Sequence, residues 1–496
     1  MPQQAVHYLL PRAQYYAPRL RYTLYMKTLR NIIIAMLATM LALTTSCIED
    51  GFTTSSSDLL EFSCDTLSFD TIFTEQGTPT KQFVVYNRHK KQINISSISL
   101  SATDGRRFYL NVDGMKGEVF HDVAIRGEDS IFVFVESKLN ANGQDAPLLA
   151  EDCINFTTNG VTQKVVLRAW GQDVERLTRP QFTADTRLTA NKPYVIFDTL
   201  YVAPGATLTI EPGTTLYFHD KAAMRIDGTL NACGTQSKPI HLRGDRTDYL
   251  FDGANYDIMS GQWGGVEFGA DSRGNEMQYV LMRGSSNGIT VSASSAEAKA
   301  LHLFNSVLHN SAGNVLLASN AWIEAEGCEF TDAAYDVVKM HGGIYRFANC
   351  TFTNYYLFGL KHCPIITIDL TDDEGNRLEP SVRLDNCIIC GNVKEFNEND
   401  FTGTDVLLRN CMLQSNGTDD SNFINCKWDG DACFRMQREK YIFDYRLGNE
   451  SSAIAAGDIS LCPEHALIDR YGQPRIYNGG IDIGAYRWIM VDDNEK

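Results

Sequence analysis

The chain has 496 residues, which is enough for two to four ordinary domains, or for fewer if one of them is an elongated repeat. A hydrophobic fraction of 44% and a charged fraction of 21% are typical of a folded protein and argue against a disordered chain. With 44 basic and 61 acidic residues the net charge is −17, so nucleic acid and anionic lipid surfaces are not expected partners of the protein body.

Residues 26–46 have the pattern of an export signal. Basic residues open the segment, an apolar run follows from Ile32 to Leu43, and small polar residues precede Cys47. This apolar run is too short to cross a bilayer as a stable helix, so the pattern predicts a cleaved signal peptide. Residues 1–25 contain no apolar run and precede a plausible initiator, Met26, so we interpret them as a mis-called leader.

The end of this segment resembles a bacterial lipoprotein signal with the relaxed lipobox found in Bacteroidetes, because Thr44 stands where leucine is preferred. The resemblance implies cleavage before Cys47, acylation of its thiol, and an outer membrane lipoprotein. The following Ile48-Glu49-Asp50 is similar to the acidic signal that places such lipoproteins on the cell surface. Residues 47–61 would form the tether. The alternative is a single membrane anchor in which Cys47 is incidental.

Residues 62–170 are expected to form an Ig-like β-sandwich, because short apolar or alternating runs recur between turn residues. The seven runs are Thr66–Asp70, Gln82–Asn87, Ile93–Leu100, Phe108–Val112, Ile131–Val135, Cys153–Thr157 and Lys164–Trp170. The first two resemble the opening of Ig-like domains of bacterial surface proteins and of the abnormal-spindle and hydin type, which implies a spacer. Residues 171–192 contain few apolar residues and are expected to be a linker.

Residues 193–490 are periodic. A four-residue pattern recurs at steps of 22, 22, 37 and 24 residues. It consists of a turn residue, then Cys or Ser, then any residue, and then a large apolar residue. The long step contains a polar insertion, Asp369 to Pro380. A period of 22–24 with short strands is that of one coil of a parallel β-helix, and is too short for a propeller blade. The chain is therefore expected to be all-β, a sandwich followed by a solenoid.

Stacking of these coils predicts an internal structural column, because equivalent residues of successive coils lie directly above one another. The column residues are Ser306, Cys328, Cys350, Cys387 and Cys411. The residue after each column position is expected to face solvent, and the Asn before most of them to adopt the left-handed conformation of a sharp bend. Buried in a column, these thiols would stay reduced. Disulfides among the twelve cysteines other than Cys47 are the alternative.

Two further segments resemble right-handed parallel β-helix proteins of the pectin-lyase-like fold. The opening carries Pro204-Gly205-Ala206-Thr207-Leu208-Thr209-Ile210 and Trp263-Gly264-Gly265-Val266, and the end carries Asp482-Ile483-Gly484-Ala485-Tyr486. The family signature continues to a Glu, whereas Arg487 and Trp488 follow here. The resemblance implies the fold and no particular chemistry.

Three functions remain open: a non-catalytic protein that binds glycans or other cells, a lyase or hydrolase of acidic polysaccharide, and a structural spacer in a surface assembly. For binding, the expected residues are Tyr355 and Tyr356 with the acidic insertion Asp372, Asp373 and Glu374, which we expect to border one groove. For catalysis, the candidate acids are Asp419, Asp420, Asp429 and Asp431, but all lie in turn-like contexts without the motifs of known enzyme families. We therefore expect no catalytic residue, no cofactor and no metal.

Overall fold

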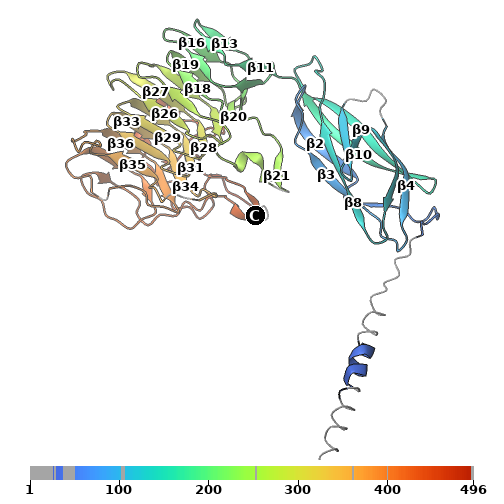
Figure 1. The fold of residues 1–496 in the computed structure, drawn as a ribbon. Coiled ribbons are helices and arrows are strands. Elements are labelled where there is room, and N and C mark those ends of the chain that lie inside the picture. The colour runs from blue at the N-terminus through green and yellow to red at the C-terminus, as the bar shows by residue number, and fades with distance from the viewer. Residues whose placement is uncertain are drawn as a thin grey trace, which may run out of the picture.

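A computed structural model describes Met26 and residues 29–36, 51–101, 107–251, 254–359, 362–398 and 400–492. Cys47, most of the expected signal peptide and residues 1–25 lie outside these ranges. Met26 and residues 29–36 are helical, and no helix among the described residues is long and apolar enough to span a membrane. The rest is almost entirely β, a sandwich followed by a parallel β-helix (Figure 1).

The sandwich consists of two five-stranded sheets. One sheet has, in spatial order, β1 (Glu61–Phe62), β3 (Lys81–Tyr86), β8 (Ser130–Ser137), β5 (Phe108–Val112) and β6 (Met115–Gly117). The other has β2 (Thr66–Phe73), β10 (Val161–Gln172), β9 (Leu148–Thr158), β4 (Ile93–Leu100) and β7 (Val119–Ile125). Alternating residues such as Val85, Val133 and Ile154 are fully buried between the sheets, as the period of two requires. The seven runs expected from the sequence are strands, and β1, β6 and β7 are additional.

The solenoid has three parallel sheets, which we call its first, second and third faces. The first face consists of β11 (Glu175–Thr178), β14 (Tyr194–Phe197), β17 (Thr215–His219), β20 (Ile240–Gly244), β25 (Val280–Arg283), β28 (Val307–Ser311), β31 (Glu329–Ala333), β34 (Thr351–Asn354), β37 (Ile388–Gly391) and β39 (Met412–Leu413). The second consists of β12 (Gln181–Phe182), β15 (Leu200–Val202), β18 (Met224–Ile226), β23 (Val266–Phe268), β26 (Ile289–Ser292), β29 (Leu316–Ser319), β32 (Val338–His341) and β35 (Ile366–Asp369). The third consists of β13 (Thr186–Leu188), β16 (Thr207–Ile210), β19 (Thr229–Cys233), β24 (Asn275–Gln278), β27 (Lys299–Phe304), β30 (Trp322–Glu326), β33 (Ile344–Ala348), β36 (Ser381–Asp385), β38 (Asp405–Arg409) and β40 (Phe423–Ile424).

The first coil begins earlier than the sequence indicates. The segment 171–192, expected to be a linker, contains β11, β12 and β13, which pair in parallel with β14, β15 and β16. These strands are two to four residues long, and the few apolar residues reflect a terminal coil that has a neighbour on only one side. The solenoid therefore follows the sandwich almost directly.

The two domains touch through the start of the solenoid. The ring of Phe73 packs edge-on against Tyr217 with centroids 4.7 Å apart, and Thr247 donates a hydrogen bond to the carbonyl of Thr71. Arg176 donates to the carbonyl of Thr74. The end of β2 therefore contacts both β17 and the loop that leaves β20.

The column residues lie at the corner between the third and first faces. Ser306, Cys328, Cys350, Cys387 and Cys411 are completely buried, and the twelve cysteines in the described residues are all free thiols. The thiols donate to main-chain carbonyls, as Cys350 does to Ala325 and Ala348. The preceding Asn305, Asn349, Asn386 and Asn410 have φ between 45° and 50°, which confirms the expected left-handed bend.

The residue after each column position is not exposed, contrary to the expectation. Val307, Glu329, Thr351, Ile388 and Met412 are at most 7% exposed. The reason is a segment that we call the C-terminal segment, residues 430–490, part of which packs on the outside of the first face. It contains η2 (Arg438–Lys440), η3 (Ile459–Leu461), η4 (Glu464–Ala466), β41 (Ile476–Tyr477) and β42 (Gly480–Ile481).

Three of these bend side chains, those of Asn305, Asn349 and Asn386, form hydrogen bonds with the C-terminal segment. Asn386 exchanges two hydrogen bonds with the main chain of Asp458, and Asn305 accepts one from the guanidinium of Arg475. Gly327 occupies the equivalent bend of the intervening coil, where a Cβ atom would lie 2.2 Å from Nη2 of Arg475. Glycine at this position therefore makes room for Arg475, which is 2% exposed.

Candidate functional site

The two tyrosines expected to stack on a ligand are engaged within the protein. Tyr356 is 6% exposed, and its hydroxyl forms a 2.6 Å hydrogen bond with the hydroxyl of Ser260. The ring of Tyr355 stacks on Tyr445 of the C-terminal segment, with centroids 6.3 Å apart. Neither ring is presented to solvent as a platform, because the loop that carries them is packed against the covered first face.

The acidic insertion lies at a different corner of the same coil. Tyr355 and Tyr356 follow β34 on the first face, whereas Asp372, Asp373 and Glu374 follow β35 on the second face. The carboxylate of Asp372 accepts hydrogen bonds from the backbone N–H groups of Glu374 and Asn376, so it closes its own turn. The structure does not bring the tyrosines and the insertion together in one groove.

The four acids considered for catalysis also lie in turns of the last coils. Asp419 accepts from the backbone of Cys426 and the indole N–H of Trp428, and Asp420 accepts from the backbone of Asn422. Asp431 accepts from the backbone of Cys433, and Asp429 is exposed with φ of 54°. These contacts account for the acids as turn-forming residues.

A buried network between the first face and the C-terminal segment is the strongest concentration of perturbed acids. Asp332 is 2% exposed and accepts hydrogen bonds from the Tyr445 hydroxyl and the Tyr355 backbone. Burial raises its pKa to about 7, and burial also raises the pKa of Glu329, which accepts from the Tyr486 hydroxyl. His309, 3.3 Å from Asp332, has a pKa lowered to about 3 by burial, so this contact involves a neutral ring.

A carboxyl group with a raised pKa is suited to general acid chemistry, but this network has no room for a substrate. The cavity beside Asp332 and His309 has a volume of about 10 Å³, which is the space of one water molecule. We therefore interpret the network as part of the attachment of the C-terminal segment.

A hollow lies on the sandwich, on the outer side of β5, β6 and β8. We call it the sandwich groove; its volume is about 680 Å³, and it is lined by Tyr109, Asn111, Lys116, Glu118, Phe134 and Glu136, among others. Tyr109 is 46% exposed, and Asn111 has a buried Oδ1 with no hydrogen-bond partner in the described part of the chain. The ring of Phe132, also 46% exposed, stacks on Phe134 with centroids 6.1 Å apart. Aromatic rings and polar groups thus share one concave surface.

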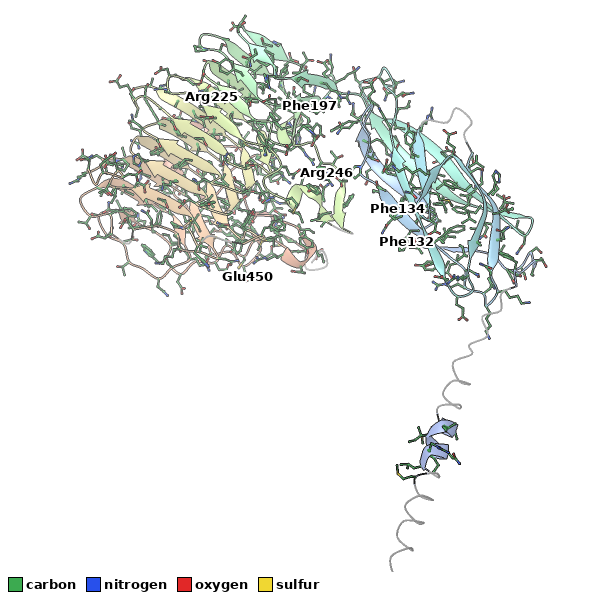
Figure 2. All side chains as sticks on the ribbon, viewed as in Figure 1. Phe132, Phe134, Phe197, Arg225, Arg246 and Glu450 are labelled. Atoms are coloured by element: carbon green, nitrogen blue, oxygen red, sulfur yellow. The ribbon has the colours of Figure 1, made fainter. Side chains whose placement is uncertain are left out.

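A second cavity of about 330 Å³ lies between the two domains. It is lined by Phe69, Phe73 and Lys81 of the sandwich and by His219, Asp245 and Arg246 of the solenoid. Thr80 lines both hollows, so the sandwich groove and this interdomain cavity lie next to each other. Figure 2 shows Phe132 and Phe134 on the side of the sandwich that faces the solenoid, with Arg246 on the opposing loop.

The sandwich groove was not expected from the sequence, although a signal for it exists. In Ile131-Phe132-Val133-Phe134-Val135 every residue is apolar, but a strand places alternate residues on opposite faces. Ile131, Val133 and Val135 fill the core, which leaves two phenylalanines on the outside. Two aromatic residues at outward positions of one strand are the feature that indicates a surface site.

Comparison with known proteins does not assign a family. No protein-family model matches the chain. Protein bark beetle of Drosophila melanogaster is 29% identical over 128 residues, which cover 22% of this chain and 4% of that protein, so this chain spans only a small part of its relative.

Similar solved structures include a family 123 glycoside hydrolase from Clostridium perfringens, with a TM-score of 0.18, 10% identity, and coverage of 25% of this chain and 26% of that one. A PapD-like domain of human CEP192 has a TM-score of 0.17 and 11% sequence identity, and the match covers 27% of this chain and 98% of that domain. The catalytic unit of a GH87 α-1,3-glucanase from Streptomyces thermodiastaticus has a TM-score of 0.17 and 7% sequence identity, and the match covers 70% of this chain and 89% of that one. TM-scores this low assign no activity to this chain.

Proposed function

We propose that this protein is a lipid-anchored surface protein that binds a neutral or weakly charged glycan in the sandwich groove. The observation that carries the proposal is the groove itself, which combines exposed aromatic rings with amide, carboxylate and ammonium groups. Sugar rings have apolar C–H faces that stack on aromatic side chains and hydroxyl edges that need hydrogen-bond partners. A concave surface with both features, which lies next to a cavity between two domains, is suited to such a ligand.

The charges favour a glycan without many carboxylates or sulfates. The groove has Lys116 but also Glu118 and Glu136, and the chain as a whole carries a net charge of −17. A polyanion would be repelled at long range by this charge. The exposed side chains of Lys116, Glu118 and Glu136 supply hydrogen-bond partners for sugar hydroxyls.

Binding is tested with purified full-length protein and an array of neutral and uronic-acid oligosaccharides. Tyr109→Ala and Phe134→Ala are expected to weaken binding of the best ligand at least tenfold, because each removes one ring from the groove. Phe358→Ala is the matched control, since Phe358 is an aromatic residue of the solenoid with the same exposure as Tyr109, 46%. No retention of any glycan, or equal loss in the control, would contradict the proposal. New reducing or unsaturated ends would show an enzyme instead.

The membrane anchor is a separate part of the proposal. It rests on the basic residues, the apolar run from Ile32 to Leu43 and the small residues before Cys47. Metabolic labelling with a fatty-acid analogue is expected to mark the wild-type protein and not Cys47→Ser. Labelling that persists in the variant would show that Cys47 is not the lipidated residue.

A further inference from the structure

A histidine on the third face is flanked by two carboxylates. His302, on β27, places Nδ1 2.6 Å from Oε2 of Glu276 on β24, and Nε2 2.7 Å from Oε2 of Glu326 on β30. A neutral imidazole has one N–H, and an ionised carboxylate can only accept. If Nδ1 donates to Glu276, the lone pair of Nε2 and the oxygen of Glu326 face each other, so the two atoms must share a cation. That cation is either a proton or a metal ion.

A third ligand comes from the C-terminal segment. His465, on η4, places Nε2 3.6 Å from Oε1 of Glu326, and one ligand atom each of His302, Glu326 and His465 lie within 4.8 Å of one another. Tetrahedral coordination at about 2.0–2.2 Å separates ligand atoms by roughly 3.3 Å. Small rotations of the Glu326 carboxylate and the exposed His465 ring therefore suffice to surround one ion.

We propose that His302, Glu326 and His465 bind a divalent first-row transition metal, zinc foremost, and that the ion fastens the C-terminal segment to the third face. Two imidazoles and one carboxylate are a ligand set that zinc takes in proteins, with water in the fourth position. Glu276 is the outer partner, because its contact with Nδ1 directs Nε2 of His302 toward the ion.

The surroundings favour a site that is formed before the ion arrives. The side chains of His302 and Glu326 are 14% and 10% exposed and lie on neighbouring strands in parallel register, whereas His465 is 59% exposed. The main chain near His465 is held by the hydrogen bond from Asn305 to the carbonyl of Ile468. Two ligands are thus fixed by the solenoid, and the third is on the solvent side, where an ion can enter. Metal binding at His302, Glu326 and His465 is independent of glycan binding in the sandwich groove.

The test uses full-length protein stripped with a chelator and titrated with Zn²⁺, Co²⁺, Ca²⁺ or Mg²⁺ alone. We expect one Zn²⁺ or Co²⁺ per chain, a rise in the melting temperature of the solenoid, and no effect of Ca²⁺ or Mg²⁺. His465→Ala is expected to weaken binding at least 100-fold, and Glu276→Gln by about 10–100-fold. His341→Ala is the matched control, because His341 contacts a single carboxylate, that of Asp369, at 3.4 Å.

The Co²⁺ spectrum separates this site from the free thiols. Ligation by nitrogen and oxygen gives visible absorption without the near-ultraviolet thiolate band that a cysteine site would give. Hydrogen exchange in residues 459–470 is expected to slow when the ion binds. A thiolate band, undiminished binding by His465→Ala, or no tightly bound ion would overturn the proposal, and the last result would mean that His302 carries a proton instead.

Discussion

Arg475→Ala is expected to lower the free energy of unfolding of the solenoid by about 3–5 kcal/mol. The guanidinium of Arg475 is buried and donates hydrogen bonds to the carbonyls of Gly484 and Ala485 and to the side chain of Asn305. Its removal leaves these buried acceptors without their donor. Chemical denaturation followed by tryptophan fluorescence measures the loss, since Trp488 lies in the segment that Arg475 holds.

Arg377→Ala is the matched control for this loss. Arg377 lies in the insertion, and its side chain is 69% exposed. Removing a solvated arginine is expected to change the stability by less than about 0.5 kcal/mol. An Arg475→Ala protein as stable as this control would show that the C-terminal segment is not held by the buried guanidinium.

Asp332→Asn is expected to stabilise the protein at pH 8 and to flatten its dependence on pH. The pKa of Asp332 is raised from about 3.8 in the unfolded chain to about 7 by burial, so the folded protein binds the extra proton between these values. Proton binding by Asp332 therefore favours the folded protein at low pH, and this contribution to the free energy of unfolding is lost as the pH rises from about 4 to about 7. The shift is about 3 pKa units, and at about 1.4 kcal/mol per unit the variant avoids a penalty of roughly 4 kcal/mol at pH 8.

The substitution is also compatible with the local structure. Asp332 has φ of 60°, a conformation that Asn adopts readily, and an amide oxygen can still accept from the Tyr355 backbone. Urea unfolding at pH 5 and pH 8 gives the comparison. Asp372→Asn serves as the control, because hydrogen bonds hold the pKa of Asp372 below its ordinary value and outside this window. If wild type and Asp332→Asn lose the same stability between pH 5 and pH 8, the assignment to Asp332 is wrong.

The solenoid could be predicted from the sequence because its signal is local and repeated. Each coil carries its own bend residue, column residue and apolar residue, so Asn349-Cys350-Thr351-Phe352 alone describes one corner. The same pattern of bend residue, cysteine and apolar residue occurs once more after Cys411, in Asn425-Cys426-Lys427-Trp428. Asn425 has φ of 52°, like the other bend residues. This occurrence lies only 15 residues after Cys411, so the repeat step of 22–24 residues does not predict it.

The candidate sites could not be predicted in the same way, because they depend on contacts between distant segments. Thr351 and Ile388 look solvent-facing until residues 430–490 are placed over them. His465 is 163 residues from His302 in the chain, and no spacing rule connects them. The interdomain cavity likewise joins Phe73 to His219, and only the packing of the two domains brings these residues together.

The attachment of the C-terminal segment has a consequence for how the chain folds. In an ideal solenoid each coil contacts only its neighbours, so folding can spread coil by coil as the chain is made. Here Asn305 is bonded to Arg475, 170 residues later, and Asn386 to Asp458, 72 residues later. The last coils of the first face therefore keep apolar groups such as Ile388 incompletely covered until Ile483 and Gly484 have been synthesised. The C-terminal segment converts a progressive assembly into one cooperative step, and a chain truncated before Arg475 is expected to remain open to proteases and to aggregation.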